Sequence, residues 1–146
     1  MIVFTNGCYD VLHPGHILFL KSIRNECIGK FAALKVIVGL NSDESVRKLK
    51  GHPRPIFTYK QRAYMMQALK MVDAVACFNE ETPLKIIEEI IPDVLAKGGD
   101  YGNVEIVGER FVIQHGGSVI KKYFLDGISS GKVLEKMSKT SYITQT

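Results

Sequence analysis

Two histidines near the N-terminus, His13 and His16, are the residues whose type and spacing best suit a chemical step. They lie in the segment 5–16, which passes from an apolar, strand-like stretch into a helix-like stretch. Residues three positions apart at a helix N-terminus lie on one side of the helix, so both rings can meet one cluster of oxygen atoms. The free backbone N–H groups at that end of a helix favour an anion. The segment therefore predicts a site for a polyphosphate.

The residues around the two histidines support this interpretation. Gly7 allows backbone to approach a phosphate closely, Pro14 suits the start of a helix, and Gly15 keeps the surface between the rings bare. The helix dipole lowers the pKa of a histidine at this end, whereas a bound polyphosphate raises it. Protonation is therefore expected to increase when a nucleotide binds, and developing charge would meet donors already in place.

Two alternatives for the histidine pair remain open, metal ligation and a purely structural cap on the turn. Zinc needs three or four ligands, and no third ligand is spaced nearby. Cys8, Cys27 and Cys77 have no C-x-x-C spacing, which argues against a zinc site or a disulfide framework. No metal held by the protein itself is expected. The chain has neither a Walker A loop nor the G-x-G-x-x-G motif.

The elements that must position these residues alternate between two types. Apolar, strand-length runs bounded by turn residues occur at 2–5, 35–40, 72–78, 93–96 and 118–124. Helical spacing between them is marked by Ile17, Leu20, Ile23 and Cys27, by Val46 and Leu49, and by Tyr64, Met65 and Leu69. Apolar strands that alternate with helices indicate a parallel sheet covered on both faces. The predicted fold class is α/β, a doubly wound, Rossmann-like sheet of five parallel strands.

Helix boundaries are also marked in the sequence. Thr58 and Gln61 have the spacing of a capping box, and Pro83 is expected at the first position of a helix. Pro92 and Gly116 lie where helices should end. Ligands of such folds bind beyond the carboxyl ends of the strands, so the site is expected at strand-to-helix turns.

Composition fits one globular domain of 146 residues, with 46% hydrophobic and 23% charged residues. The formal net charge of +4 is scattered along the chain, which favours a small anionic substrate over nucleic acid. No apolar run approaches the ~18 residues of a membrane helix, and the N-terminus lacks the basic region of a signal peptide. We expect a cytoplasmic protein that binds neither nucleic acid nor membrane, with a domain over 1–137 and a polar tail over 138–146.

The segment 7–16 resembles the G-x-F-D-x-x-H-x-G-H signature of the cytidylyltransferase-like nucleotidyltransferase superfamily, with Tyr9 in place of the usual phenylalanine. Further segments are similar to one branch, the adenylyltransferase domain of bacterial ADP-heptose synthase. They are 5–8, 41–43, 45–47, 49–51, 54–55, 62, 72–73, 82–83, 92–95 and 97–101. The resemblance runs from Ile2 to about Met137, and it implies a homodimer.

The resemblance also assigns roles at the first turn. His13 and His16 would stabilise the transition state at the α-phosphate of ATP. An oxygen of the sugar phosphate would attack in line and pyrophosphate would leave, so catalysis would rest on positioning and electrostatics. Mg²⁺ would bridge the nucleotide phosphates instead of occupying a protein cage. The triphosphate would be bound by Thr5, Asn6, Gly7, Cys8, Tyr9 and Gly15.

Basic residues further along the chain are also candidates. Lys50, expected in a loop after the second helix, would contact the incoming phosphate unless it is a solvated lysine. Arg62 falls in the first turn of a helix, where a cation is unfavourable to the dipole, so a phosphate partner would explain its position. Arg54 and Asn41 are expected to contact substrate. Asp10 either orients the loop or meets the acceptor substrate.

Two later segments complete the candidate site. Gly98 and Asp100 follow a strand and would contact the nucleotide, unless they form a plain glycine turn. The stretch 127–130 resembles a G-[IC]-S-T-T segment whose hydroxyls hold the β- and γ-phosphates in the family. Ser129 and Ser130 would do so here, with simple helix capping as the alternative. Gly131 replaces the last hydroxyl and loosens the helix start by up to ~1 kcal/mol relative to alanine.

The expected reaction is transfer of AMP from ATP to D-glycero-β-D-manno-heptose 1-phosphate, which gives ADP-heptose and pyrophosphate. The enzymatic alternative is CTP-dependent transfer to glycerol 3-phosphate or another polyol phosphate, because glycerol-3-phosphate cytidylyltransferase shares the histidine motif and the Ile128–Ser129 segment. The non-enzymatic alternative is a regulatory module that binds a nucleotide without catalysis.

Overall fold

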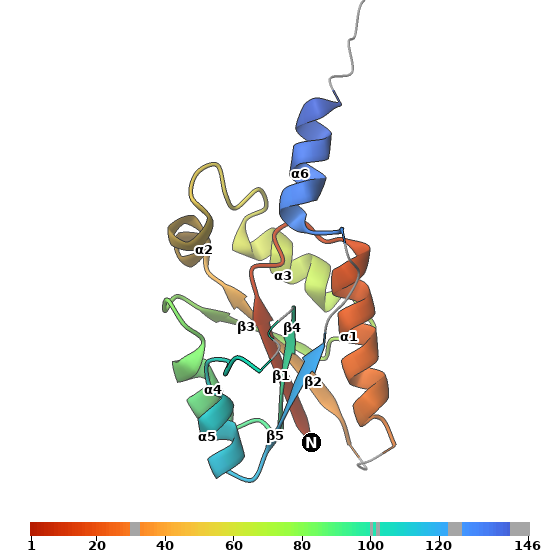
Figure 1. Ribbon diagram of the computed structural model, residues 1–146, viewed down its shortest axis with the longest axis vertical. Helices are drawn as coiled ribbons and strands as arrows, with labels where there is room; N and C mark the ends of the chain where they lie inside the picture. Colours follow the sequence, from red (N-terminus) through yellow and green to blue (C-terminus); the bar gives the residue numbers. More distant parts are fainter. Residues whose placement is uncertain (30–32, 100, 102, 123–126, 141–146) are drawn as a thin grey trace, which may run out of the picture.

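The structure is a computed structural model that describes residues 1–29, 33–99, 101, 103–122 and 127–140. Strands and helices alternate along these ranges (Figure 1). The strands are β1 (Ile2–Gly7), β2 (Lys35–Asn41), β3 (Ala74–Phe78), β4 (Val94–Gly98) and β5 (Ser118–Lys122). The helices are α1 (Pro14–Cys27), α2 (Asp43–Lys50), α3 (Tyr59–Gln67), α4 (Leu84–Ile90), α5 (Glu109–Gln114) and α6 (Ser130–Lys139).

The strands form one parallel sheet in the order β3-β2-β1-β4-β5. The chain first adds strands on one side of β1 and then crosses to the other side, so the strand order reverses between β1 and β4. In an open parallel sheet the ligand crevice forms at the carboxyl ends of the strands at such a point. The predicted doubly wound, five-stranded parallel sheet is confirmed.

Helices cover both faces of the sheet (Figure 1). On one face, Leu20 and Ile23 of α1 and Met66 of α3 are buried in one apolar cluster. On the other face, Ile87 of α4 and Val112 of α5 are buried in a second cluster. Successive strand residues point to opposite faces, so each strand contributes to both clusters. The apolar strand sequences reflect this burial on two sides.

The buried face of α3 differs from the prediction. Tyr64, expected as a core position, is 76% exposed, whereas Arg62, Ala63 and Met66 are buried. The reason is that Arg62 points inward, where backbone carbonyls and a carboxylate accept its hydrogen bonds. A polar anchor thus decides which side of this short helix faces the core.

Helix boundaries agree with the sequence signals to within one residue. The capping box forms, with the Gln61 N–H donating to Thr58 Oγ1 at 3.4 Å and the Thr58 N–H donating to Gln61 Oε1 at 2.9 Å. Pro83 is the N-cap of α4 and not its first helical residue. Pro92 follows the left-handed C-cap of α4, and Gly116, with φ at +81°, follows the end of α5.

Helix α6 extends away from the sheet beyond its carboxyl edge (Figure 1). None of its residues is fully buried. The helix continues to Lys139, so the polar tail predicted from Ser138 begins inside it, and residues 141–146 lie outside the described ranges. Across the described ranges, every helix is too short or too polar to cross a membrane.

Candidate active site

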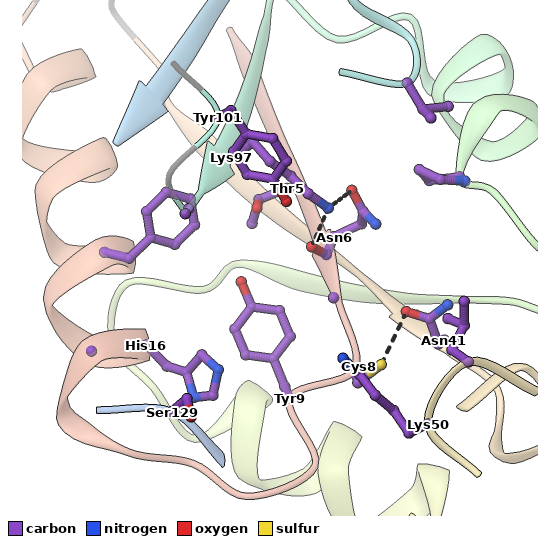
Figure 2. A pocket seen from close by; sticks show the side chains of 18 of the residues that line it. Thr5, Asn6, Cys8, Tyr9, His16, Asn41, Lys50, Lys97, Tyr101 and Ser129 are labelled. Atoms are coloured by element: carbon purple, nitrogen blue, oxygen red, sulfur yellow. Dashed lines mark hydrogen bonds between the residues drawn. The ribbon is translucent and has the colours of Figure 1, made fainter. Parts of the chain in front are cut away.

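A cavity of about 610 Å³ opens at the carboxyl edge of the sheet, beside the start of α1 (Figure 2). Strand ends, the β1–α1 turn and the residues before α6 contribute to its wall. Most of the predicted site residues line it: Thr5, Asn6, Gly7, Cys8, Tyr9, His13, Gly15, His16, Asn41, Lys50, Gly98 and Ser129.

The two histidine rings stack on each other at the N-terminus of α1. Their centroids are 3.8 Å apart and their planes differ by 26°. The backbone N–H of His13, the N-cap residue, donates to Nδ1 of His16 at 3.4 Å. A neutral His16 that accepts at Nδ1 carries its proton on Nε2. The ring of His16 thus caps the turn through one nitrogen and keeps the other as a donor for a ligand.

The absence of a side chain at Gly15 leaves room for the ring of His13. A Cβ atom at Gly15 would lie 3.0 Å from both Cε1 and Nδ1 of His13, closer than side chains normally approach. Nδ1 of His13 is buried and has no hydrogen-bond partner among the described residues. A side chain at position 15 would therefore crowd the ring of His13 on the side of this nitrogen.

Both histidines are mainly neutral at pH 7 in the free protein. Burial and, to a smaller extent, the neighbouring His13 together lower the pKa of His16 to about 4. Burial also lowers the pKa of His13. A polyphosphate beside the rings would favour their protonated forms and raise both pKa values. The site is thus suited to gain positive charge when a nucleotide binds.

Tyr9 forms the wall between the histidines and β1. Its ring centroid lies 4.9 Å from that of His16, and its hydroxyl points toward Thr5 (Figure 2). The φ of Tyr9 is +46°, a left-handed conformation that is rare for an aromatic residue and often found at functional sites. Burial raises the pKa of Tyr9 to about 12 despite the nearby Thr5 hydroxyl. Gly7 is needed beneath it, because a Cβ there would lie 3.0 Å from Cε2 of Tyr9.

Asp10 orients the loop that precedes α3. Its buried carboxylate accepts hydrogen bonds from the backbone N–H groups of Ile56 at 2.9 Å and Phe57 at 2.8 Å, and it forms an ion pair with Arg54. Burial alone would raise the pKa of Asp10, but these hydrogen bonds and the guanidinium outweigh it and leave the pKa below its ordinary value.

The predicted substrate contacts of Asp10 and Arg54 are therefore corrected. Both residues lie outside the cavity lining, and each uses the other as its charged partner. Of the two roles left open for Asp10, the structure supports the one that orients the loop.

Arg62 is also corrected, because it is fully buried and leaves no surface for a phosphate. Its Nε donates to the carbonyl of Phe57 at 3.0 Å and its Nη1 to the carbonyl of Cys8 at 2.7 Å. Its Nη2 donates to the carbonyl of Asn41 and to the carboxylate of Asp43, both at 2.8 Å. Arg62 thus ties the β1–α1 turn, the end of β2 and α3 together.

The sequence placed Lys50 in the loop after the second helix. In the structure it is instead the last residue of α2. Its exposed side chain lines the cavity and lies near Cys8, just after the end of β1 (Figure 2). Nearby, Asn41 Nδ2 donates to Ser45 Oγ at 2.9 Å, and Asn41 Oδ1 accepts from Cys8 Sγ at 3.8 Å. Burial raises the pKa of the Cys8 thiol although Lys50 opposes the rise. Lys50 is therefore the exposed cation on this wall.

The two serines before α6 have different roles. Ser129 is the N-cap of α6, where its Oγ accepts from the N–H of Lys132 at 3.2 Å, and it also lines the cavity. The hydroxyl of Ser130 donates to the carbonyl of Val11 at 3.1 Å and is absent from the cavity lining. The phosphate contact predicted for Ser130 stays a prediction, and in this structure its hydroxyl joins α6 to the β1–α1 turn.

The end of β4 holds one predicted residue and one that sequence reasoning missed. Gly98 lines the cavity, and a Cβ there would lie 3.1 Å from Cδ2 of Phe19. Asp100 lies outside the described residues. Lys97 was not among the predicted site residues, yet it lines the cavity, and its Nζ donates to the backbone O and to Oδ1 of Asn6. The available signal was a lysine at the carboxyl end of an otherwise apolar strand.

Comparison with known proteins assigns the family. The cytidylyltransferase-like family model matches residues 4–136. The chain belongs to the cytidylyltransferase-like family. The predicted superfamily and enzyme class, a nucleotidyltransferase, are confirmed by this membership.

Curated relatives of this cytidylyltransferase-like chain include longer proteins. It is 48% identical over 133 residues to the bifunctional protein HldE of Rhodopseudomonas palustris strain BisB5, covering 91% of this chain and 26% of that protein. It is 45% identical over 136 residues to the bifunctional protein HldE of Citrifermentans bemidjiense, covering 93% of this chain and 27% of that protein. The chain thus spans about a quarter of the length of these relatives.

A solved structure supports the fold of this family member. The crystal structure of the lipopolysaccharide core biosynthesis protein from Thermoplasma volcanium GSS1 superposes with a TM-score of 0.64 at 24% identity, covering 88% of this chain and 98% of that one.

The candidate site offers few ligands for a metal. Within the described ranges, His, Cys, Asp and Glu side chains form no group of three or more able to hold an ion. Glu81 is the one carboxylate among the described residues of the cavity wall.

Proposed function

We propose that this chain is an adenylyltransferase that transfers AMP from ATP to D-glycero-β-D-manno-heptose 1-phosphate and so forms ADP-heptose and pyrophosphate. The family membership and the similarity to HldE proteins support nucleotidyl transfer in heptose biosynthesis. The single observation that carries the proposal is the stacked pair of His13 and His16 at the start of α1, facing a cavity large enough for a nucleotide.

The chemistry follows from what this pair offers. An oxygen of the acceptor phosphate attacks the α-phosphorus of ATP, the bond between that phosphorus and the oxygen bridging to the β-phosphate breaks, and pyrophosphate leaves. Nε2–H of His16 and the N-terminal N–H groups of α1 are donors for the oxygens that carry the developing charge. No covalent bond to the protein is required.

Two further groups supply charge. Mg²⁺, if held by oxygens of the triphosphate, would neutralise part of its negative charge. Lys50, exposed in the cavity wall, would attract the phosphate of the acceptor. Reactants held in this way react as if they were one molecule, which is the main source of rate in such transfers.

The proposal is tested by pyrophosphate release in the presence of Mg²⁺, with ATP or CTP paired with heptose 1-phosphate or glycerol 3-phosphate. We expect turnover with ATP and heptose 1-phosphate. Turnover only with CTP and glycerol 3-phosphate would replace the proposal with the cytidylyltransferase alternative. Tight nucleotide binding without turnover for any pair would instead indicate a regulatory module.

A further inference from the structure

Lys97 crosses the crevice where the strand order of the sheet reverses. It is the penultimate residue of β4, and its half-buried Nζ donates to the backbone O of Asn6 at 3.2 Å and to Asn6 Oδ1 at 3.0 Å (Figure 2). The two residues are 91 positions apart in the chain and belong to neighbouring strands. The ammonium group is therefore fixed in the cavity wall at the place where parallel sheets bind ligands.

Lys97 differs from the other cations that the fold buries. Among the described residues, no carboxylate lies within ion-pair distance of its Nζ, and both of its hydrogen-bond acceptors are neutral. Arg62, by contrast, pairs with Asp43. Lys121, the register neighbour of Lys97 on β5, pairs with Glu109 at 2.8 Å. Burial also lowers the pKa of Lys97.

Such an arrangement favours an external anion. Burying a cation without a counter-charge is unfavourable, so buried charges are nearly always paired. An ammonium has three N–H donors, and Asn6 accepts two hydrogen bonds. The third donor has no acceptor among the described residues, and Lys97 lines a cavity that, by the proposed function, receives phosphate groups from both the nucleotide and the acceptor.

We propose that Lys97 is a phosphate-binding residue, held in place by Asn6, whose counter-charge is supplied by a substrate phosphate. This inference rests on the proposed function. The alternative is that Lys97 acts only as an internal brace for β1. Lys97→Gln separates the two roles because it keeps a donor for Asn6 without the charge: a brace would retain both Tm and phosphate binding, whereas a phosphate-binding residue would lose binding at an unchanged Tm.

The test uses Lys97→Met and Lys97→Gln, with Lys122→Met as the matched control. Lys122 lies on β5 outside the cavity lining, so its variant removes the same charge away from the site. Lys97→Gln keeps a donor for Asn6 but removes the charge. Binding of ATP, adenosine and heptose 1-phosphate is measured by calorimetry, and Tm by thermal unfolding without ligand.

We expect both Lys97 variants to weaken the binding of ATP or of heptose 1-phosphate at least ~10-fold, the scale of a lost charge-assisted hydrogen bond. Adenosine binding and Tm should remain at the values of the wild type and of Lys122→Met, or Tm should rise. Loss confined to ATP assigns the contact to the nucleotide, and loss confined to heptose 1-phosphate assigns it to the acceptor.

Three results would overturn the inference: unchanged affinity for both phosphorylated ligands, an equal loss for adenosine and ATP, or a fall in Tm that accompanies the loss of binding. These outcomes are distinct from failure of the proposed function, because they are read from binding and unfolding and not from pyrophosphate release.

Discussion

The start of α1 and the start of α6 border the same cavity but are built differently. Each helix has a glycine at its second position, Gly15 in α1 and Gly131 in α6. A Cβ at Gly15 would meet the ring of His13 at 3.0 Å, whereas the nearest atom to a Cβ at Gly131 is Ser129 Oγ at 3.8 Å. Helix α1 buries several residues in the core, and α6 buries none.

The start of α1 is therefore a preorganised wall of the cavity, whereas the start of α6 is a wall that is free to adjust. Donors that must meet a transition state are most effective when packing already holds them in place. The start of α1 has that packing, and the start of α6 is held mainly by the bond from Ser130 to Val11. We therefore expect substitutions at α1 to reduce the rate and substitutions at α6 to change mainly stability.

The largest effect is expected for His16→Ala. We expect kcat for pyrophosphate release to fall at least ~100-fold, the scale of losing one preorganised transition-state donor, while the Kd for ATP changes little. His115→Ala is the matched control, because that histidine caps the end of α5 outside the cavity lining and should leave kcat unchanged. Wild-type turnover in His16→Ala would rule out the assigned role.

The next effect is expected for Gly15→Ala. The added methyl group has to displace the His13 ring, so we expect kcat to fall about 10-fold, part of the loss expected for removing a whole donor. Stability should not fall with it, because alanine is a better helix former than glycine. Steady-state kinetics and thermal unfolding of the same preparation check both points. Unchanged kcat would show that the stacked geometry is not needed.

The pH dependence of stability separates the two helix starts further, because of the two only the start of α1 contains histidines. The folded pKa of His16 is about 4 and its ordinary value is 6.5, so the unfolded chain takes up the proton first. The contribution of His16 to the free energy of unfolding should be fully present well above pH 6.5 and should be lost as the pH decreases toward 4. Urea unfolding between pH 7 and about 5 measures the joint contribution of His16 and His13, because burial also lowers the pKa of His13, whereas the lowered pKa values of the Asp10 and Asp73 carboxylates act mainly at lower pH.

In His16→Ala the fall in the free energy of unfolding should be shallower over the same interval. If the variant and the wild type show the same slope, the titration belongs to another group. Addition of ATP should raise the pKa of His16, which NMR titration of the ring protons can follow.

The smallest effect is expected for Gly131→Ala. The site is open and the backbone is helical, so the free energy of unfolding should rise by up to ~1 kcal/mol with kcat unchanged. Urea unfolding and the pyrophosphate assay measure the two quantities. A drop in kcat here as large as that in Gly15→Ala would contradict the contrast between the two helix starts.

Much of the site could be predicted because its pattern is local. The spacing of His13, Gly15 and His16 by itself placed both rings at one helix start, and the structure stacks them there. The errors concern residues whose partners are distant in the sequence. Arg62 meets acceptors up to 54 positions away, and Asp10 meets Arg54 44 positions away. No local pattern reveals such partners, so charged side chains that brace loops were assigned to substrate.

The sequence by itself determined the alternation of strands and helices, the parallel sheet and the histidine pair, because periodicity, capping and spacing act over a few residues. Only the tertiary structure decided the strand order β3-β2-β1-β4-β5, which brings Lys97 beside Asn6 and turns Arg62 away from the cavity. The physical reason is that a charged side chain takes its role from the groups packed against it, and the order of the strands decides which groups those are.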